Sequence, residues 1–113
     1  MKNILIYNDI SGLGNCSMAA NLPIFTKLGH YCMPIVTASY SCQTGFGNFV
    51  AQRNDNVAVF TDRLLANRTP DAIYVGFGND SGILGALTDV VSGFSSKDVY
   101  LFVDPTMGDN GAL

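Results

Sequence analysis

Residues 4–15 read ILIYNDISGLGN, an apolar run that changes at once into polar residues and glycines. The apolar residues 4–7 do not alternate with polar ones, which is typical of a strand buried on both faces. The glycines and polar side chains of residues 8–15 predict a turn after that strand. A strand of this kind belongs in a sheet covered by helices on both sides, so the sequence predicts an α/β fold.

The segments that follow alternate between helix and strand patterns. Apolar residues at helical spacing predict a helix from Met18 to Leu28, with either a kink or a late start caused by Pro23. Further strands are predicted at 31–37, 72–75 and 99–103, and further helices at 59–67 and 83–94. This alternation indicates a mostly parallel sheet with flanking helices and right-handed crossovers.

A long polar segment from Ala38 to Asn56 separates the second strand from the next helix. It contains Gln43, Thr44 and Gly45, and long loops in compact domains are usually functional. We therefore expect a substrate flap in this segment. Pro34, in the strand before it, predicts an edge position or a bulge.

Composition excludes several classes of protein. The 113 residues form one domain at most, and 48% hydrophobic against 13% charged residues is typical of a sheet covered on both faces. A net charge of −3 without a Lys/Arg cluster argues against nucleic-acid binding. The N-terminal apolar run is too short for a signal peptide or a membrane span, and three cysteines without zinc spacing fit a reducing cytoplasm.

Two aspartates follow the last predicted strand. Asp104 comes directly after it and Asp109 a few residues later. Ligands of open α/β sheets bind outside the carboxyl ends of the strands, so both carboxylates are candidates to hold a metal or order a phosphate. Asn8, Asp9 and Phe77 end other strands and would reach the same edge. The alternative is that the aspartates only brace a turn.

Gly12 and Gly14 also suggest a dinucleotide-binding turn. That fingerprint is incomplete, because Ser17 occupies the third glycine position and no acidic residue ends the second predicted strand. The alternatives are a tight turn that needs positive φ and a close approach of the loop to a small ligand. A flavodoxin-like or Rossmann domain stays a rival hypothesis, which flavin or NAD affinity would test.

Four motifs along the chain resemble pyridoxal (pyridoxamine) kinase. They are residues 8–15, residues 37–45 with their Gln-Thr-Gly ending, the Gly-Phe-Gly turn at 76–78, and DPTMGD at 104–109. The chain is less closely similar to the hydroxymethylpyrimidine kinases of thiamine synthesis, which share the ribokinase-like fold. The resemblance implies ATP-dependent phosphorylation of the hydroxymethyl group of a B6 vitamer (pyridoxal, pyridoxamine or pyridoxine) to the 5′-phosphate.

The resemblance also implies roles for single residues. The substrate-binding positions are Asn8, Asp9, Gln43, Thr44, Gly45 and Phe77. Asp104 would lie beside the ATP phosphates and Asp109 would help to hold Mg²⁺. Phosphoryl transfer depends on positioning and on a metal that neutralises phosphoryl charge, so these roles agree with the chemistry. A homodimer of the full-length protein is implied in the same way.

Two positions depart from the pyridoxal kinase pattern. Asn8 stands where these kinases commonly have serine, and Gln43 stands where they have histidine before the flap threonine. The Asp9-x-Ser11-Gly12 arrangement is closer to the hydroxymethylpyrimidine kinases. A pyrimidine alcohol therefore stays an alternative substrate.

The catalytic base of the family has no counterpart here. Family members are more than twice as long, and their glycine-rich anion hole with its aspartate base lies in the C-terminal half. No Gly-x-Gly-Asp occurs in these residues, and Asn79 in the nearest string is an amide that cannot act as a base. We therefore expect residues 1–113 to be the N-terminal substrate-binding part of one kinase domain, inactive alone, with its base beyond Leu113. The alternative is a non-catalytic vitamin-binding remnant.

Overall fold

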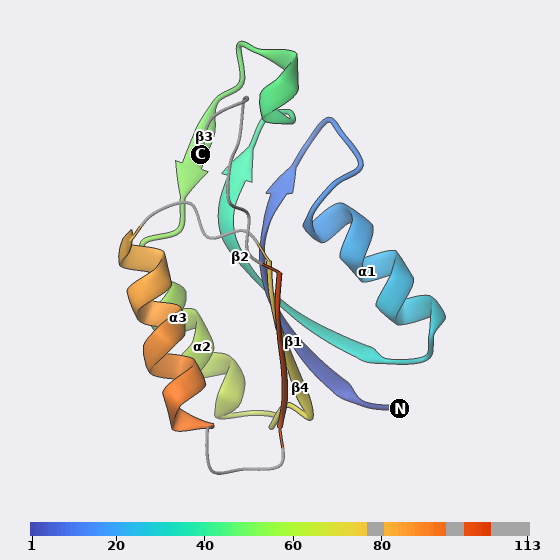
Figure 1. Ribbon diagram of the computed structural model, residues 1–113, viewed down its shortest axis with the longest axis vertical. Helices are drawn as coiled ribbons and strands as arrows, with labels where there is room; N and C mark the ends of the chain where they lie inside the picture. The colour runs from blue at the N-terminus through green and yellow to red at the C-terminus, as the bar shows by residue number, and fades with distance from the viewer. Residues whose placement is uncertain (77–80, 95–98, 105–113) are drawn as a thin grey trace.

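Five strands form one sheet in the computed structural model of the protein, which describes residues 1–76, 81–94 and 99–104. The described elements are β1 (Asn3–Ser11), α1 (Met18–Lys27), β2 (Tyr31–Tyr40), the short 3₁₀ helix η1 (Thr44–Phe46), β3 (Ala51–Arg53), α2 (Val57–Leu65), β4 (Ala72–Val75), α3 (Ser81–Gly93) and β5 (Tyr100–Val103). Helices flank the sheet on both sides (Figure 1), which confirms the predicted α/β class. None of the described helices has the length and apolar character needed to cross a membrane.

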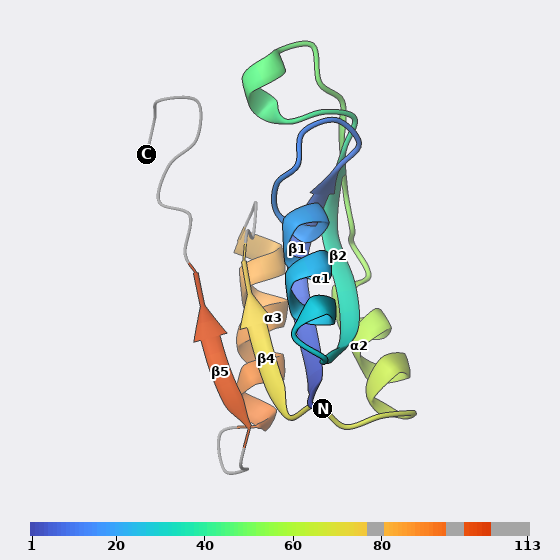
Figure 2. The same cartoon turned by 90° about the vertical axis from the view of Figure 1, so that its right-hand side faces the viewer.

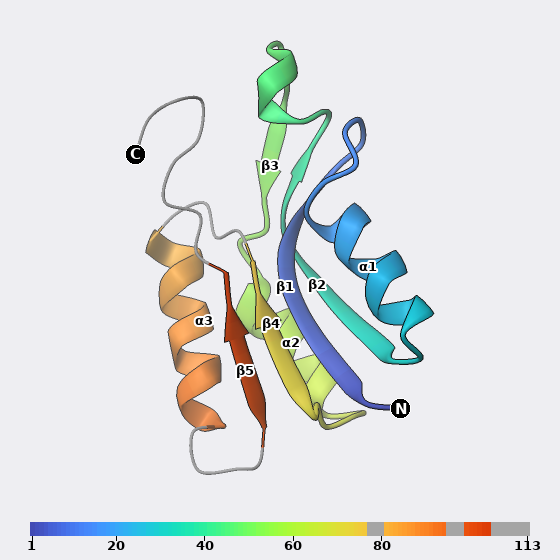
Figure 3. The same ribbon diagram turned by 45° about the vertical axis from the view of Figure 1, so that its right-hand side comes forward.

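The strand order places β1 at the centre of the sheet. The order is β3-β2-β1-β4-β5, with β2, β1, β4 and β5 parallel and β3 antiparallel to β2 (Figure 3). The chain adds β2 on one side of β1 and then β4 and β5 on the other. The order therefore reverses beside β1, and the carboxyl edge at such a switch point is where open α/β sheets bind ligands.

Both faces of β1 are covered, which explains its unbroken apolar run. Ile4 and Ile6 pack with Met18 of α1 on one face, while Leu5 and Tyr7 join the core under α2 and α3 on the other. Leu5, Ile6 and Tyr7 are fully buried. Figure 1 shows the resulting three layers, with α1 on one side of the sheet and α2 and α3 on the other.

The carboxyl end of β1 differs from the prediction. A turn was expected from Asn8 onward, but the strand continues to Ser11 because β2 supplies a partner over that length. Asn8 pairs with Val36 and Ile10 pairs with Ser39, so Asp9 alone lies opposite two residues of β2. This register shift is a β-bulge, a device that re-aims side chains near functional sites.

The flap is more ordered than a polar loop. β2 extends to Tyr40, η1 follows, and β3 returns antiparallel to residues 38–40. The prediction missed β3 because its three residues are all exposed and show no alternation of apolar and polar residues. In the described sheet β3 pairs only with residues 38–40 of β2. Pro34 therefore lies on a stretch of β2 whose described strand partner is β1, which agrees with the edge position predicted for this proline. The late helix start predicted from Pro23 is wrong, because α1 begins at Met18 and contains that proline.

Strand β5 lies at the margin of the described sheet (Figure 2). All four of its residues are exposed, although all are apolar or aromatic: Tyr100, Leu101, Phe102 and Val103. Exposed apolar edge strands are rare in soluble domains, because they present unpaired backbone groups and apolar surface together. The composition of β5 is therefore that of a strand covered by other parts of a protein.

Replacing Tyr7 with phenylalanine should lower the free energy of unfolding by about 1 kcal/mol at neutral pH. The Thr61 hydroxyl donates to the Val57 carbonyl (2.8 Å), so the Tyr7 phenol is the donor in its 2.9 Å hydrogen bond to Thr61. Burial raises the pKa of Tyr7 above its ordinary value of 10.0. The folded state thus keeps a proton that the unfolded chain loses, and stability falls as the pH rises above about 10.

Urea unfolding at pH 7 and above pH 10 measures both effects. The Tyr7→Phe protein should lose less stability between the two pH values than the unchanged protein. Tyr31→Phe is the control, since that ring is 46% exposed and packs under the Arg68 guanidinium, 4.4 Å from its centre. If the unchanged and Tyr7→Phe proteins lost the same free energy of unfolding between pH 7 and the alkaline pH, the prediction would be contradicted.

Candidate functional site

The turn after β1 and the flap are joined at the carboxyl edge of the sheet. The Gly12 amide donates to the Tyr40 carbonyl (2.9 Å), and the Gln43 amide donates to the Leu13 carbonyl (2.7 Å). A Cβ at Gly12 would lie 2.8 Å from the Ser41 carbonyl oxygen, so this close approach requires glycine. The two segments therefore form one assembly beyond the ends of β1 and β2.

Asn8 lies buried at the base of this edge, 4% exposed. Its Nδ2 donates to Asn21 Oδ1 of α1 (2.6 Å), and its Oδ1 accepts from the Asp9 amide (3.0 Å). Gly76, directly after β4, makes room for this side chain, because a Cβ there would lie 2.5–2.7 Å from the Asn8 amide atoms. The amide of Asn8 is thus held from three segments of the chain.

Asp9 carries a buried oxygen that has no hydrogen-bond partner among the described residues. The residue is 7% exposed, and no described group donates a hydrogen bond to its Oδ1. A buried unsatisfied acceptor costs about 1–3 kcal/mol, and more when it is charged, so native proteins tolerate few of them. Such an oxygen at the edge where α/β sheets bind ligands has the properties of an acceptor for a donor group on a ligand.

The predicted flap residues occupy the start of η1. Gln43 precedes the helix, and Thr44 and Gly45 are its first two residues. Gly14 lies against Gln43, since an added Cβ would come 2.9 Å from the Gln43 Cβ. The turn after β1 therefore fixes the base of the flap.

Asp104 directly follows β5 and is exposed. Its amide donates to the Val75 carbonyl (2.9 Å), and its Oδ2 accepts from the Tyr74 hydroxyl (3.2 Å). Phe77 and Asp109, the other two predicted site residues, lie outside the described residues. Within the described ranges no cluster of three or more metal-ligating side chains occurs.

Tyr74 and Asn21 are site neighbours that the sequence interpretation missed. Burial raises the pKa of Tyr74 above its ordinary value, the Asp104 carboxylate raises it further, and a hydrogen bond with Asn21 lowers it. A signal for Asn21 was available in the sequence. It lies three residues after Met18 and four before Phe25, so an amide occupies the apolar face of α1.

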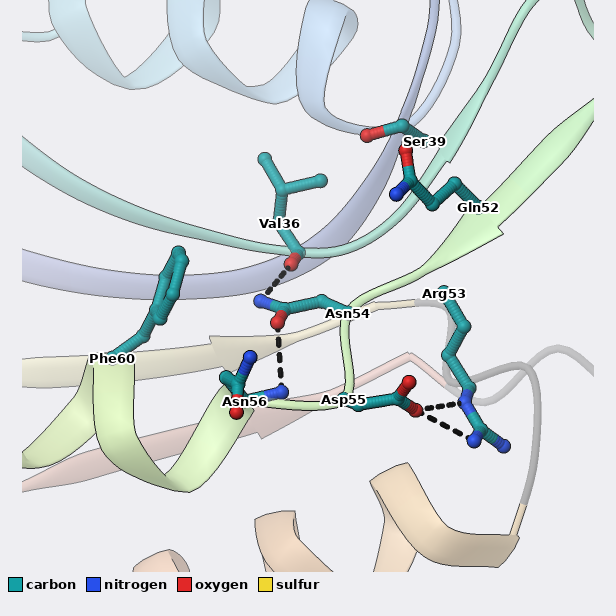
Figure 4. A pocket seen from close by; sticks show the side chains of 8 residues that line it. All are labelled: Val36, Ser39, Gln52, Arg53, Asn54, Asp55, Asn56 and Phe60. Carbon is teal, nitrogen blue, oxygen red and sulfur yellow. Dashed lines mark hydrogen bonds and ion pairs between the residues drawn. The ribbon is translucent and has the colours of Figure 1, made fainter.

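A hollow of about 380 Å³ lies at the flap stem, the part of the flap where β2 pairs with β3 and the chain turns into α2 (Figure 4). Three of its lining side chains, Arg53, Asn54 and Asp55, are engaged with one another or with the backbone. Asn54 Nδ2 donates to the Val36 carbonyl (2.9 Å), Asn54 Oδ1 accepts from the Asn56 amide (2.9 Å), and Arg53 pairs with Asp55 at 2.6 Å. These contacts brace the turn between β3 and α2, and none of the predicted site residues that the structure describes lines this hollow.

Solved structures similar to this chain include proteins described as kinases. A protein assigned as a phosphomethylpyrimidine kinase from Bacteroides thetaiotaomicron, crystallised with pyridoxal, matches 99% of the chain with a TM-score of 0.88 and 28% identity. The phosphomethylpyrimidine kinase of Clostridium difficile 630 matches all of it with a TM-score of 0.83 and 22% identity. The pyridoxal kinase of Staphylococcus aureus in complex with AMP-PCP matches all of it with a TM-score of 0.81 and 23% identity.

The matches cover only part of each similar protein. The chain spans 40% of the length of the Bacteroides protein, 48% of the Clostridium protein and 41% of the Staphylococcus protein. No protein-family model and no curated protein matches the sequence. The predicted ribokinase-like fold and the resemblance to the N-terminal part of pyridoxal kinases are confirmed at the level of structure.

Proposed function

We propose that this chain is the substrate-binding part of an ATP-dependent kinase that phosphorylates the hydroxymethyl group of a B6 vitamer to the 5′-phosphate. The observation that carries the proposal is the whole-chain likeness to the Bacteroides protein that was crystallised with pyridoxal. The second candidate is a hydroxymethylpyrimidine kinase. It is favoured by the Asp9-x-Ser11-Gly12 arrangement and by the phosphomethylpyrimidine kinases among the similar structures.

The substrate side of the proposed site consists of β1 and the flap. Asn8 and Asp9 form its base, and the Asp9 Oδ1 accepts a hydrogen bond from a donor on the ring substrate. Such donors exist on both candidate rings, as a hydroxyl or a protonated nitrogen of a pyridine and as the amino group of an aminopyrimidine. The flap contributes Gln43, Thr44 and Gly45, and Phe77 packs near the ring.

The nucleotide side of the proposed site begins at Asp104. Its exposed carboxylate fits Mg²⁺ or a Mg²⁺-bound phosphate, because hard cations prefer carboxylate oxygens. The Tyr74 hydroxyl donates to the Oδ2 of this carboxylate, and no group of the described residues donates to its Oδ1. Asp109 completes the metal site in this proposal. When bound, Mg²⁺ neutralises charge on the phosphoryl oxygens during transfer.

Residues 1–113 are proposed to be the N-terminal part of a single domain whose base lies beyond Leu113. The exposed apolar strand β5 supports this, because further chain packed on it would bury four large side chains. A cytoplasmic location is supported by the three free thiols Cys16, Cys32 and Cys42. A homodimer of the full-length protein is expected from the resemblance alone.

The deciding experiment is a phosphorylation assay on the protein as its source organism produces it. The protein is incubated with Mg·ATP and separately with pyridoxal, pyridoxamine, pyridoxine or hydroxymethylpyrimidine, and the product is identified by mass spectrometry. Phosphorylation of a pyridine alcohol that stops on removal of Mg²⁺ is the expected result. Preference for the pyrimidine would favour the second candidate, and tight binding without turnover would indicate a vitamin-binding remnant.

Replacing Asp9 with asparagine should weaken the binding of the ring alcohol without lowering the stability of the fold. Asparagine keeps the shape but removes the charge of the unpartnered acid, so the free energy of unfolding should stay the same or rise by about 1 kcal/mol. Affinity for the ring alcohol should fall about tenfold, because the acceptor that faces the donor group of the ligand loses its charge. Calorimetric titration and urea unfolding measure the two quantities. Asp89→Asn on the exposed side of α3 is the control, and unchanged affinity in Asp9→Asn would remove Asp9 from the site.

A further inference from the structure

Ser41 closes the flap with both its backbone and its side chain. The strands β2 and β3 pair as far as Tyr40 and Ala51, and residues 42–49 form the flap tip beyond them. The Ser41 amide donates to the Val50 carbonyl (2.8 Å), and the Val50 amide donates to Ser41 Oγ (2.8 Å). Two hydrogen bonds between one pair of residues therefore hold the two ends of the flap tip together.

The Ser41 hydroxyl takes a place that a backbone carbonyl usually fills. A hydrogen-bonded pair in an antiparallel ladder exchanges two bonds between backbone amides and carbonyls. Here the hydroxyl accepts from Val50, while the Ser41 carbonyl oxygen lies by the turn after β1, 2.8 Å from the position of a Cβ on Gly12. The hydroxyl therefore lets the backbone turn away from β3 while the Val50 amide keeps an acceptor.

The residues that follow Ser41 lie against the turn after β1. The Gln43 amide donates to the Leu13 carbonyl (2.7 Å), and η1 with Thr44 and Gly45 begins directly after Gln43. These are the flap residues of the proposed substrate side, and Figure 3 shows the flap projecting beyond the carboxyl end of β1 beside that turn. Their position depends on the direction that the chain takes at Ser41.

We propose that Ser41 is a positioning residue whose hydroxyl fixes the flap tip, so that Gln43, Thr44 and Gly45 stand at the carboxyl edge before a ligand binds. The hydroxyl acts through the Val50 amide and does not touch the ligand. This inference rests on the proposed function for the identity of the ligand, whereas the closed flap tip is a property of the described residues. A preformed loop favours binding, because less conformational entropy is lost when the ligand arrives.

The kinetic test compares Ser41→Ala with Ser41→Thr in the full-length protein. Alanine removes the acceptor of the Val50 amide, whereas threonine keeps a hydroxyl, and the exposed position of Ser41 accommodates one more methyl group. Ser41→Ala should raise the KM for the ring alcohol about fivefold with kcat within about twofold, because a looser flap weakens binding and leaves the reacting atoms untouched. Ser41→Thr should restore the KM to within about twofold of the unchanged protein.

The matched control is Ser39→Ala. Ser39 is an exposed serine of the same strand, and its side chain lies at the flap stem beside Gln52 (Figure 4). Its replacement should leave the KM within about twofold of the unchanged protein. An unchanged KM in Ser41→Ala, an increase that Ser41→Thr does not reverse, or an equal increase in Ser39→Ala would overturn the inference.

Amide hydrogen exchange follows the flap tip without any activity. In Ser41→Ala the Val50 and Gln43 amides should exchange about fivefold faster, because the flap tip opens more often. The Asn54 amide, which donates to the Thr37 carbonyl (2.9 Å) at the other end of β3, should keep its rate. An unchanged rate at Gln43 would refute the role of Ser41 even in an active kinase. Faster exchange in a protein that phosphorylates no ring alcohol would refute only the proposed function.

Discussion

Replacing Gly76 with alanine is expected to lower the free energy of unfolding by about 2–3 kcal/mol and to weaken ring-alcohol binding at least about tenfold. An added Cβ would lie 2.5 Å from Asn8 Nδ2, 2.6 Å from its Cγ and 2.7 Å from its Oδ1. Asn8 is buried and hydrogen-bonded to Asn21 and to the Asp9 amide, so it can yield only by breaking these bonds. The steric cost of the added Cβ and the cost of the lost hydrogen bonds therefore both lower the free energy of unfolding.

Urea unfolding and calorimetric titration with the ring alcohol measure the two effects of Gly76→Ala. Gly85→Ala is the matched control, because no described atom lies within 4 Å of a Cβ at that exposed position in α3. It should raise the free energy of unfolding by about 0.5–1 kcal/mol through helix propensity. Adding Asn8→Ala to Gly76→Ala should recover stability, since it removes the atoms in collision. A Gly76→Ala protein as stable as the unchanged one would contradict the argument.

Under the proposed function, Asp104→Asn is expected to lower the phosphorylation rate about a hundredfold, because the charge that is proposed to face the cation and the phosphates is lost. Asparagine keeps an oxygen that accepts from the Tyr74 hydroxyl, so the arrangement around Tyr74 is preserved. Stability should change little, because the carboxylate is exposed. Steady-state kinetics at varied Mg²⁺ concentration measure the loss, and the Mg²⁺ concentration required for half-maximal rate should rise.

The control for Asp104→Asn is Asp55→Asn. Asp55 is also an exposed carboxylate, but it pairs with Arg53 at the flap stem. Its replacement should leave the rate within about twofold of the unchanged protein, as surface ion pairs contribute little. Equal losses of phosphorylation rate in the two variants would mean that the change in overall charge causes the loss. An Asp104→Asn protein with an unchanged rate would exclude Asp104 from the nucleotide side.

The sequence located the carboxyl-edge segments but not how they touch. The predicted turn after β1 and the predicted flap are both at this edge, and Asp104 follows β5 as expected. The contacts between them depend on pairings of segments far apart in the chain, such as Gly12 with Tyr40 and Gln43 with Leu13. The position at which β1 ends also depends on a pairing between distant segments, because Asp9 becomes part of a strand only when β2 lies beside it.

Local periodicity by itself determined the layered α/β fold, since an unbroken apolar run, an amphipathic helix and their alternation each report which faces are buried. Residues 4–7 are the clearest case, with both faces covered as their pattern required. Only the tertiary structure decided the strand order, the short exposed strand β3 and the hydrogen bonds that join Asn8 to Asn21 and Tyr74 to Asp104. Burial leaves a mark in the residues of one segment, whereas a hydrogen bond between distant segments is specified only when the chain brings both partners together.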